Sequence, residues 1–315
     1  MPRDKKQTGS LIYGPVPSRR LGLSLGVDLV PYKTCTFDCI YCQIGRTAKT
    51  VTERRPYVEP EKIISELKLS LAEGDAPDFI TLGGSGEPCL NSEIGRIIRQ
   101  IRQISDIEVA VLTNGSLLWS PQVRADLLQA DVVLPSLDAY DEETFRKINR
   151  PHPDVSFEAL FGGLAEFRKV YNGRIWLEIF IVRGINDTQE AMAAFRSYME
   201  ELAPDRIHIN TAVRPPAEDY AGQVSGQKLE HLASVLGNGA EVVAEFREKK
   251  GALNGKQMDT RILEMLSRRP CTASDIASGL GLEEKSVARR MTEFSDSGKV
   301  ETKKSGGRKY YFKKS

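Results

Sequence analysis

Apolar residues along the first two thirds of the chain follow two alternating spacings. Strand-type apolar runs occur at 21–30, 79–82, 109–112, 132–134, 175–182 and 207–209. Between them, apolar residues recur every three or four positions near 60–71, 93–104, 121–129, 157–170 and 188–202, the spacing of one helix face. Six strands alternating with helices predict an α/β fold with a parallel sheet and right-handed crossovers. This pattern is consistent with an open partial barrel or a doubly wound sheet.

The spacing changes after residue 257. Three short helical patterns carry Ile262, Met265 and Leu266, then Ala273, Ile276 and Ala277, then Val287, Met291 and Phe294. Two β-type segments follow at 299–304 and 308–313, around Ser305-Gly306-Gly307. Three helices and a hairpin predict a winged helix-turn-helix. We therefore divide the chain into an N-terminal extension (1–22), a barrel (23–240), a linker (241–256) and a winged helix (257–315).

Three cysteines lie close together directly after the first strand. Cys35, Cys39 and Cys42 form a C-x3-C-x2-C pattern within residues 31–46, and pairing them in disulfides would leave one over. Three thiolates suit an iron–sulfur cubane with one open iron. Zinc is the alternative, although it usually takes four ligands, and the three histidines, His152, His208 and His231, lie far away in the chain. We expect Cys89 and Cys271 to be buried as small apolar residues.

The loops after the other strands are rich in small and polar residues. They are Gly83–Pro88, Thr113–Gly115, Pro135–Asp138, Arg183–Asp187 and Asn210–Pro216. Because the carboxyl ends of parallel strands meet at one face, we expect these loops to surround one active site. The arginines near this face flank the cysteine loop or follow strands: Arg19, Arg20, Arg46, Arg54, Arg55, Arg150, Arg183 and Arg214. Scattered arginines are usually solvated surface residues, whereas several at one mouth would favour an anionic substrate. Glu178, in an apolar strand, is predicted to face the barrel interior and to orient an arginine or a cofactor hydroxyl.

The charge is unevenly distributed over the 315 residues. Residues 257–315 hold 13 Lys/Arg and 8 Asp/Glu, a net charge of +5, whereas residues 1–256 carry −4. The predicted recognition helix bears Lys285, Arg289 and Arg290, and the wing bears Lys303, Lys304, Arg308 and Lys309, which is typical of nucleic-acid binding. A protein-docking module is the alternative. No apolar run is long enough to cross a bilayer, so we expect a cytoplasmic protein without membrane contact.

These features together carry a family resemblance. The cysteine pattern with Tyr41 before its last member, the Gly84-Ser85-Gly86-Glu87-Pro88 loop, the Leu112-Thr113-Asn114-Gly115 turn and the Ser136-Leu137-Asp138 turn resemble the radical S-adenosylmethionine superfamily over about residues 20–215. Segments 14–20 and 141–151 resemble the group related to 4-demethylwyosine synthase, which modifies tRNA. The chain has no cysteine before Cys35, no flavodoxin module, and an additional C-terminal domain, so the resemblance does not extend to wyosine synthesis itself.

The resemblance implies a partial (β/α)6 barrel and a radical mechanism. Cys35, Cys39 and Cys42 would bind a [4Fe–4S] cluster, and S-adenosylmethionine would chelate its open iron. One electron from a flavodoxin or ferredoxin would then give methionine and a 5′-deoxyadenosyl radical that abstracts hydrogen from the substrate. By the same resemblance, Tyr41 would pack near the adenine, the loop of Gly84, Ser85, Gly86 and Glu87 would meet the methionine amino group, and Asn114 and Ser136 would contact the ribose or carboxylate.

Three hypotheses for function follow. The first is a radical S-adenosylmethionine enzyme that modifies RNA, with tRNA as the first choice, in which the winged helix holds RNA rather than DNA. The second keeps the enzyme and gives it a protein or peptide that the winged helix recognises. The third is a DNA-binding regulator that senses the cluster or S-adenosylmethionine without turnover.

Overall fold

The computed structural model describes residues 10–73, 76–237, 239–243, 255–305 and 307–314. Its larger part is one eight-stranded sheet whose strands follow one another in chain order. They are β1 (Ile12–Ser18), β2 (Gly22–Val27), β3 (Phe79–Leu82), β4 (Glu108–Thr113), β5 (Val132–Pro135), β6 (Arg174–Ile181), β7 (Arg206–Thr211) and β8 (Ala240–Val242). β1 and β2 are antiparallel, and each later pair of neighbours is parallel. The predicted α/β fold with a mainly parallel sheet is confirmed.

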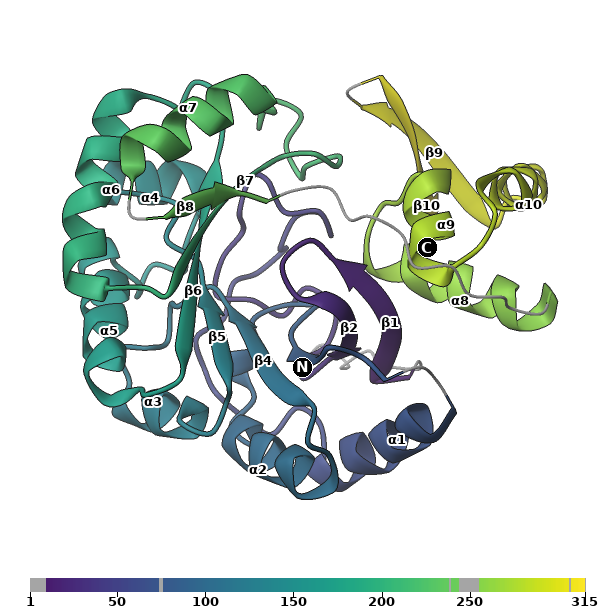
Figure 1. Ribbon diagram of the computed structural model, residues 1–315, viewed down its shortest axis with the longest axis horizontal. Helices are drawn as coiled ribbons and strands as arrows, with labels where there is room; N and C mark the ends of the chain where they lie inside the picture. The colour runs from purple at the N-terminus through teal and green to yellow at the C-terminus, as the bar shows by residue number, and fades with distance from the viewer. Residues whose placement is uncertain (1–9, 74–75, 238, 244–254, 306, 315) are drawn as a thin grey trace.

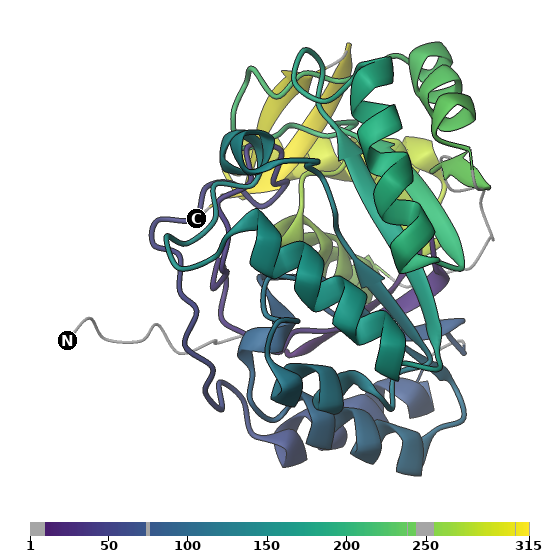
Figure 2. The ribbon, with the colours of Figure 1, turned by 90° about the vertical axis from the view of Figure 1, so that its left-hand side faces the viewer.

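The strand order decides between the two predicted architectures. A doubly wound sheet reverses its strand order at a switch point, whereas this sheet runs from β1 to β8 without reversal. Helices α1 (Pro60–Glu73), α2 (Ile94–Ile104), α3 (Pro121–Leu127), α5 (Phe157–Val170), α6 (Gln189–Leu202) and α7 (Gly226–Leu236) surround its outer face (Figure 1, Figure 2). Among the described residues no strand pairing joins β1 to β8, so the barrel is open.

Two edge strands correct the predicted domain boundaries. Residues 12–18, assigned to an N-terminal extension, form β1, and the predicted linker begins inside β8. Gly14, Pro15 and Pro17 hide the strand pattern of β1, but an edge strand tolerates proline because its outer side needs no ladder bond. β8 has only three residues, too few for a periodic signal. Residues 244–254 of the predicted linker lie outside the described residues, and its last two residues, 255–256, begin α8.

One short helix was not predicted. α4 (Glu142–Ile148) has seven residues, which gives barely two turns of apolar spacing. Asp141 caps it by accepting a hydrogen bond from Thr144 N at 2.7 Å, satisfying one of the free N–H groups of its first turn. No helix in the described ranges is long and apolar enough to cross a membrane.

The inward-facing side chains of β6 mark three levels of the barrel interior. Trp176 lies in an apolar cluster and meets Phe79 edge-on, with ring centroids 5.9 Å apart. Two residues on, Glu178 forms an ion pair with Arg20. Another two residues on, Phe180 stacks on Tyr41. Because strand side chains alternate between faces, this one strand leads from a closed apolar floor to the open carboxyl end.

Three helices and a hairpin follow at the C-terminus, as predicted. α8 (Gly255–Arg268), α9 (Ala273–Leu280), α10 (Glu284–Asp296), β9 (Val300–Ser305) and β10 (Arg308–Lys313) form what we call the C-terminal unit. Its own apolar core includes Ile262, Ile276, Val287, Met291 and Phe294. Thr272 caps α9 in a capping box with Asp275, which adds to the stability of this short helix. Cys89 and Cys271 are fully buried, as expected.

The C-terminal unit packs against the open side of the barrel (Figure 1). Helices α8 and α9 contact β1, and Gly279 of α9 lies so close that an added Cβ would be 3.2 Å from Pro17. Tyr310 donates a hydrogen bond to the Val213 carbonyl at 2.6 Å, and Lys303 pairs with Asp219 at 2.7 Å. The unit therefore joins β1 to the loop after β7.

Candidate active site

The loop that carries the three cysteines is held by a backbone ladder. Ile40 N donates to the Ile148 carbonyl at 2.9 Å, and His152 N donates to the Thr36 carbonyl at 2.8 Å. Phe37 and Pro151 form an isolated bridge between the same two segments. The segment after α4, which contributes to the family resemblance, therefore acts as a strand-like support for the cysteine loop.

Each cysteine sulfur lies next to one side-chain N–H donor from a different part of the chain. Asn114 Nδ2 is 3.6 Å from Cys35 Sγ, Asn149 Nδ2 is 3.5 Å from Cys39 Sγ, and Lys33 Nζ is 3.4 Å from Cys42 Sγ. All three cysteines are free of disulfides. Because N–H donors favour a thiolate over a thiol, these contacts suit sulfurs that act as metal ligands.

Burial opposes the thiolate form. It raises the pKa of Cys35 to about 12 and the pKa of Cys39 well above its ordinary value, and the nearby carboxylates of Glu87 and Asp138 add to these increases. A positively charged iron centre would offset this cost. The buried sulfurs and the N–H donors beside them therefore fit cysteines that bind a cluster better than three free thiols.

Three grouped cysteines suit a cluster better than a structural zinc ion, which usually takes four protein ligands. Within the described residues, no three His, Cys, Asp or Glu side chains converge on a point where one metal ion would bind. Thiolates around a single zinc are about 3.8 Å apart, since each Zn–S bond is about 2.3 Å, whereas the thiolates of a cubane bind separate irons. When bound, a [4Fe–4S] cluster would supply one electron and an iron that has no cysteine ligand.

The glycine-rich loop after β3 is tied directly to the cysteine loop. Lys33 N donates to the Ser85 carbonyl at 2.7 Å, and Glu87 N donates to the Thr34 carbonyl at 3.0 Å. Between these bonds, a Cβ on Gly86 would lie 1.9 Å from the Thr34 oxygen, so only glycine fits there. Gly84, Ser85 and Gly86 line one cavity together with the three cysteines. The predicted gathering of these two loops is present in the structure.

Glu87 has a different position from its loop neighbours. It is 2% exposed, and its carboxylate accepts hydrogen bonds from Cys89 N at 3.0 Å, from the Thr113 hydroxyl at 2.7 Å and from Asn114 N at 2.7 Å. Burial raises its pKa, and these bonds oppose the increase. Glu87 therefore joins the loops after β3 and β4 and does not line the cavity, so its contact with S-adenosylmethionine stays a prediction.

Tyr41 and Asp138 connect the cysteine loop to β6. The Tyr41 ring stacks on Phe180, with centroids 3.8 Å apart, and its hydroxyl donates to Asp138. Asp138 also accepts from Asn149 Nδ2 at 2.7 Å and from Phe180 N at 2.9 Å. Because Asn149 also contacts Cys39, the buried Asp138 orients the donor to that sulfur. The sequence drew attention to Ser136 in this turn, whereas Asp138 is the residue linked to the cysteines.

The structure separates Asn114 and Ser136 from the other predicted cofactor residues. The Asn114 amide donates to Thr36 Oγ1 at 2.7 Å as well as facing Cys35. Ser136 N donates to the Thr113 carbonyl at 3.2 Å, and neither side chain lines the cavity. The predicted residues that do line it are Cys35, Cys39, Cys42, Tyr41, Gly84, Ser85 and Gly86.

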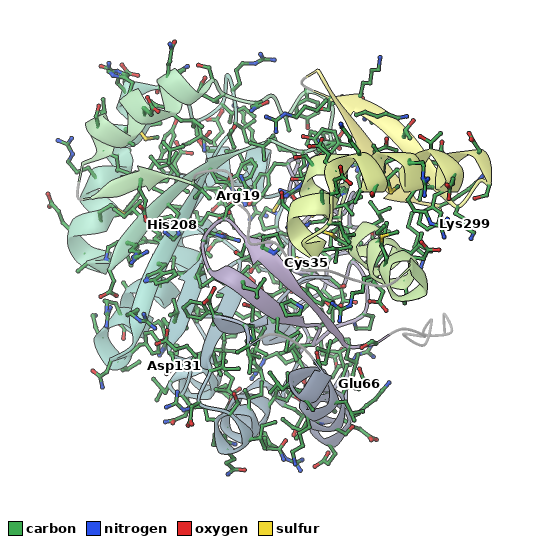
Figure 3. All side chains as sticks on the ribbon, turned by 45° about the vertical axis from the view of Figure 1, so that its right-hand side comes forward. Arg19, Cys35, Glu66, Asp131, His208 and Lys299 are labelled. Atoms are coloured by element: carbon green, nitrogen blue, oxygen red, sulfur yellow. The ribbon has the colours of Figure 1, made fainter. Side chains whose placement is uncertain are left out.

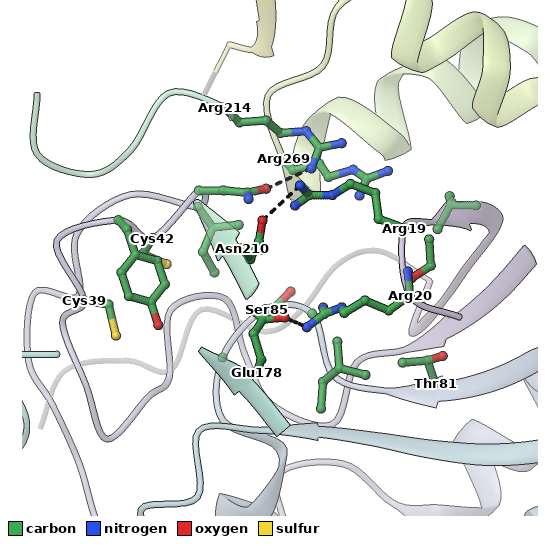
Figure 4. A pocket seen from close by; sticks show the side chains of 18 of the residues that line it. Arg19, Arg20, Cys39, Cys42, Thr81, Ser85, Glu178, Asn210, Arg214 and Arg269 are labelled. Atoms are coloured by element: carbon green, nitrogen blue, oxygen red, sulfur yellow. Dashed lines mark hydrogen bonds and ion pairs between the residues drawn. The ribbon is translucent and has the colours of Figure 1, made fainter. Parts of the chain in front are cut away.

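The cavity occupies the carboxyl end of the barrel and has a volume of about 380 Å³, within the range of small-molecule sites. We call it the central cavity. The wall opposite the cysteine loop carries Arg19, Arg20, Arg214 and Arg269 (Figure 4). Figure 3 labels Arg19 and Cys35 near the middle of the molecule, and both line the central cavity. Of the eight arginines named from the sequence, Arg19, Arg20 and Arg214 line the cavity and the other five do not. Arg269, from the C-terminal unit, was missed.

Side chains from the strands and loops around the cavity orient its arginines. Arg20 pairs with Glu178, which confirms that this carboxylate orients an arginine. Arg19 donates to the Asn210 amide oxygen at 3.0 Å, and Arg214 donates to the Gln43 amide oxygen at 3.2 Å. Burial, together with neighbouring arginines, lowers the pKa of Arg20 and of Arg214 to about 10. Two of these cations, Arg19 and Arg214, are therefore oriented by neutral amides.

Comparison with known proteins identifies the family. The family model "Radical SAM superfamily" matches residues 29–196, which include the three cysteines and the strand-end loops. A UPF0026 protein of Methanocaldococcus jannaschii is 36% identical over 242 residues, covering 76% of this chain and 74% of the relative. The chain belongs to the radical S-adenosylmethionine superfamily, whose enzymes use a [4Fe–4S] cluster and S-adenosylmethionine.

A further relative and two solved structures extend the comparison. A protein named GTPase Obg of Brachyspira hyodysenteriae is 37% identical over 292 residues, covering 92% of this chain, but the chain spans only 43% of that relative. A radical SAM methyltransferase from Sphaerobacter thermophilus has a TM-score of 0.52 at 16% identity, covering 70% of this chain and 65% of its own. Streptococcus suis SuiB bound to S-adenosylmethionine has a TM-score of 0.52 at 13% identity, covering 69% and 50%. These two structures share the fold.

Proposed function

We propose that the protein reductively cleaves S-adenosylmethionine to a 5′-deoxyadenosyl radical and uses this radical to modify RNA, with tRNA as the first substrate to test. One observation carries the RNA part. The basic C-terminal unit contributes Met265 and Arg269 to the wall of the central cavity. A nucleic acid held by this unit would therefore lie at the mouth of the cavity that contains the cysteines.

The C-terminal unit is proposed to act as a winged helix-turn-helix. In this fold α10 would be the recognition helix and the β9–β10 hairpin the wing. The Arg289 side chain on α10 is 84% exposed, and its Nε lies 3.8 Å from a carboxylate oxygen of Glu293, which is a long ion pair. Arg289 therefore remains accessible to a phosphate. Lys285 and Lys304 are also exposed. These positions support contacts to a nucleic-acid backbone.

Two residues of the predicted basic footprint are engaged within the protein. Arg290 pairs with Asp259 and Glu293, and Lys303 pairs with Asp219 of the barrel. Their charges are largely neutralised, so we remove both from the proposed phosphate contacts. Lys285, Arg289, Lys304, Arg308 and Lys309 are left as candidates.

The RNA proposal is tested with the full chain, reconstituted and reduced without oxygen. We expect 5′-deoxyadenosine to form, and its yield to rise when total tRNA is added. Cys39→Ala removes one cluster ligand and should abolish the product. The double variant Lys285→Gln/Arg289→Gln should keep the basal cleavage and lose most of the increase caused by tRNA, because it removes two exposed phosphate contacts.

The outcomes separate the three hypotheses. Cleavage that peptides stimulate and tRNA does not would favour a protein substrate. Specific DNA binding that depends on the cluster, without 5′-deoxyadenosine, would favour a regulator. Equal cleavage by the wild-type protein and Cys39→Ala would overturn the radical mechanism itself.

A further inference from the structure

Three arginines from distant parts of the chain meet where the C-terminal unit closes the barrel. Arg19 follows β1, Arg214 follows β7 and Arg269 follows α8. Their guanidinium groups gather on one side of the central cavity (Figure 4). Like charges are not expected to collect in a partly closed space without a counter-charge, since each one makes the burial of the others more costly.

Two of these cations, Arg214 and Arg269, have few counter-charges among the described residues. Within the described part of the chain, Arg269 has no carboxylate partner. Arg214 Nη2 is 3.7 Å from a carboxylate oxygen of Asp275. Arg214 is 9% exposed, yet its Nε has no hydrogen-bond partner. A buried donor without a partner is unusual in a folded protein and indicates a missing acceptor.

A second, smaller cavity lies against the same side chains. It has a volume of about 120 Å³ and is lined by Arg19, Arg214 and Arg269, which it shares with the central cavity, and by Thr272 and Ser274 at the start of α9. The N-terminus of a helix adds partial positive charge and N–H donors. The three arginines therefore lie between two cavities, one leading to the cysteines and the other to α9.

We infer that Arg19, Arg214 and Arg269 bind a phosphate group of the substrate, at a site shared by the barrel and the C-terminal unit. A phosphate offers several acceptor oxygens to planar guanidinium groups, which bind it in a forked geometry. Because the three arginines line both cavities, a substrate whose phosphate binds them can extend its remaining atoms into the central cavity. This inference rests on the proposed function, because it places the phosphate on the molecule that the radical would attack.

The site is tested by titrating inorganic pyrophosphate into the full chain, with binding followed by calorimetry. We expect saturable binding that weakens as salt is added. Arg269→Gln should weaken it about tenfold or more, because it removes a charge-assisted hydrogen bond, and Arg269→Lys should restore part of the loss. Arg99→Gln, a matched change at an exposed position of α2, should have no effect.

Loss of binding must be separated from loss of folding, so the melting temperature of each variant is measured as well. No saturable binding by the wild-type protein would overturn the site. Equal binding by a folded Arg269→Gln variant would also overturn it. Cleavage of S-adenosylmethionine by the wild-type protein is measured in parallel: if cleavage proceeds without pyrophosphate binding, only this inference fails, and if cleavage is absent, the proposed function fails independently.

The source of the phosphate is then identified by competition. A nucleoside triphosphate and a short oligoribonucleotide are each titrated with and without pyrophosphate. The ligand that pyrophosphate displaces, and whose affinity falls in Arg269→Gln, is the ligand whose phosphate binds the three arginines. Displacement of the triphosphate alone would support a phosphate site for a free nucleotide and count against RNA as the substrate. Displacement of neither would overturn the inference.

Discussion

The two walls of the central cavity are built in different ways. One wall, the sulfur wall, consists of Cys35, Cys39 and Cys42 from a single loop. The other, the arginine wall, consists of Arg19, Arg214 and Arg269, which come from the two ends of the barrel and from the C-terminal unit. The sulfur wall is consequently visible in the sequence, whereas the arginine wall exists only after three separate segments have packed together.

The two walls also differ in charge. Buried carboxylates lie near the sulfur wall, where Glu87 and Asp138 contribute to the raised pKa values of Cys35 and Cys39. Across the cavity, neighbouring arginines contribute to the lowered pKa of Arg214. An anionic group entering the cavity would be drawn to the arginines and away from the cysteines. The sulfur wall supports the reaction shared by the superfamily, and the arginine wall is suited to select the substrate.

The largest effect is expected where the sulfur wall meets the glycine-rich loop. Gly86→Ala would place a methyl group against the Thr34 carbonyl and separate the two loops, at a cost of about 1–3 kcal/mol or more. We expect iron content after reconstitution to fall severely. Gly162→Ala is the control, because an added Cβ there meets nothing within 4 Å on helix α5 and should stabilise by about 0.5–1 kcal/mol. Normal iron content in Gly86→Ala would contradict this account of the loop contact.

The next effect concerns the ion pair below the arginine wall. Glu178→Gln keeps the size of the side chain but leaves Arg20 without its acidic partner, which should cost about 3 kcal/mol because both groups are largely buried. Urea unfolding measures the loss. The double variant Arg20→Met/Glu178→Gln should recover part of it, and strictly additive single effects would show that the pair does not interact.

The charge of Arg20 also acts on His208 of β7. Burial, followed by the charge of Arg20, lowers the pKa of His208 from 6.5 to about 4. Between pH 6.5 and about pH 4, His208 takes up a proton in the unfolded chain but not in the folded protein. The neutral His208 side chain therefore contributes to the free energy of unfolding above pH 6.5, and this contribution is lost as the pH falls toward 4.

Stability measured by urea unfolding tests this effect. From pH 7 to pH 4.5, the wild-type protein should lose about 2 kcal/mol more than His208→Gln, which cannot titrate. Identical pH profiles for the two proteins would show that His208 has an unshifted pKa.

The smallest effect concerns a cation on the sulfur wall. Lys33 donates to Cys42 Sγ, and a positive charge near a thiolate ligand favours the reduced, more negative cluster. Lys33→Met should lower the reduction potential by roughly 40 mV, which corresponds to about 1 kcal/mol for one electron. A redox titration followed by electron paramagnetic resonance measures it. An unchanged or higher potential would show that Lys33 does not stabilise the reduced state.

Local patterns allowed much of the barrel to be predicted. The six predicted strand runs overlap β2 to β7, and Gly84, Ser85 and Gly86 reached the cavity as expected. The missed elements have weak local signals: β1 is interrupted by Pro15 and Pro17, and α4 is short. Asp138 and Asn149 were missed as a pair because their link to Cys39 depends on contacts across the fold.

The sequence by itself determined the sulfur wall, because three cysteines on one loop need no long-range contact to meet. It also determined the alternation of strands and helices, since apolar periodicity is a local property. Only the tertiary structure decided that Arg269 of the C-terminal unit faces Arg19 and Arg214. The sequence gives the charge of an arginine, but its counter-charge depends on which side chains pack beside it. Among the described residues, packing places Asp275 beside Arg214 and leaves the Nε of Arg214 without a hydrogen-bond partner.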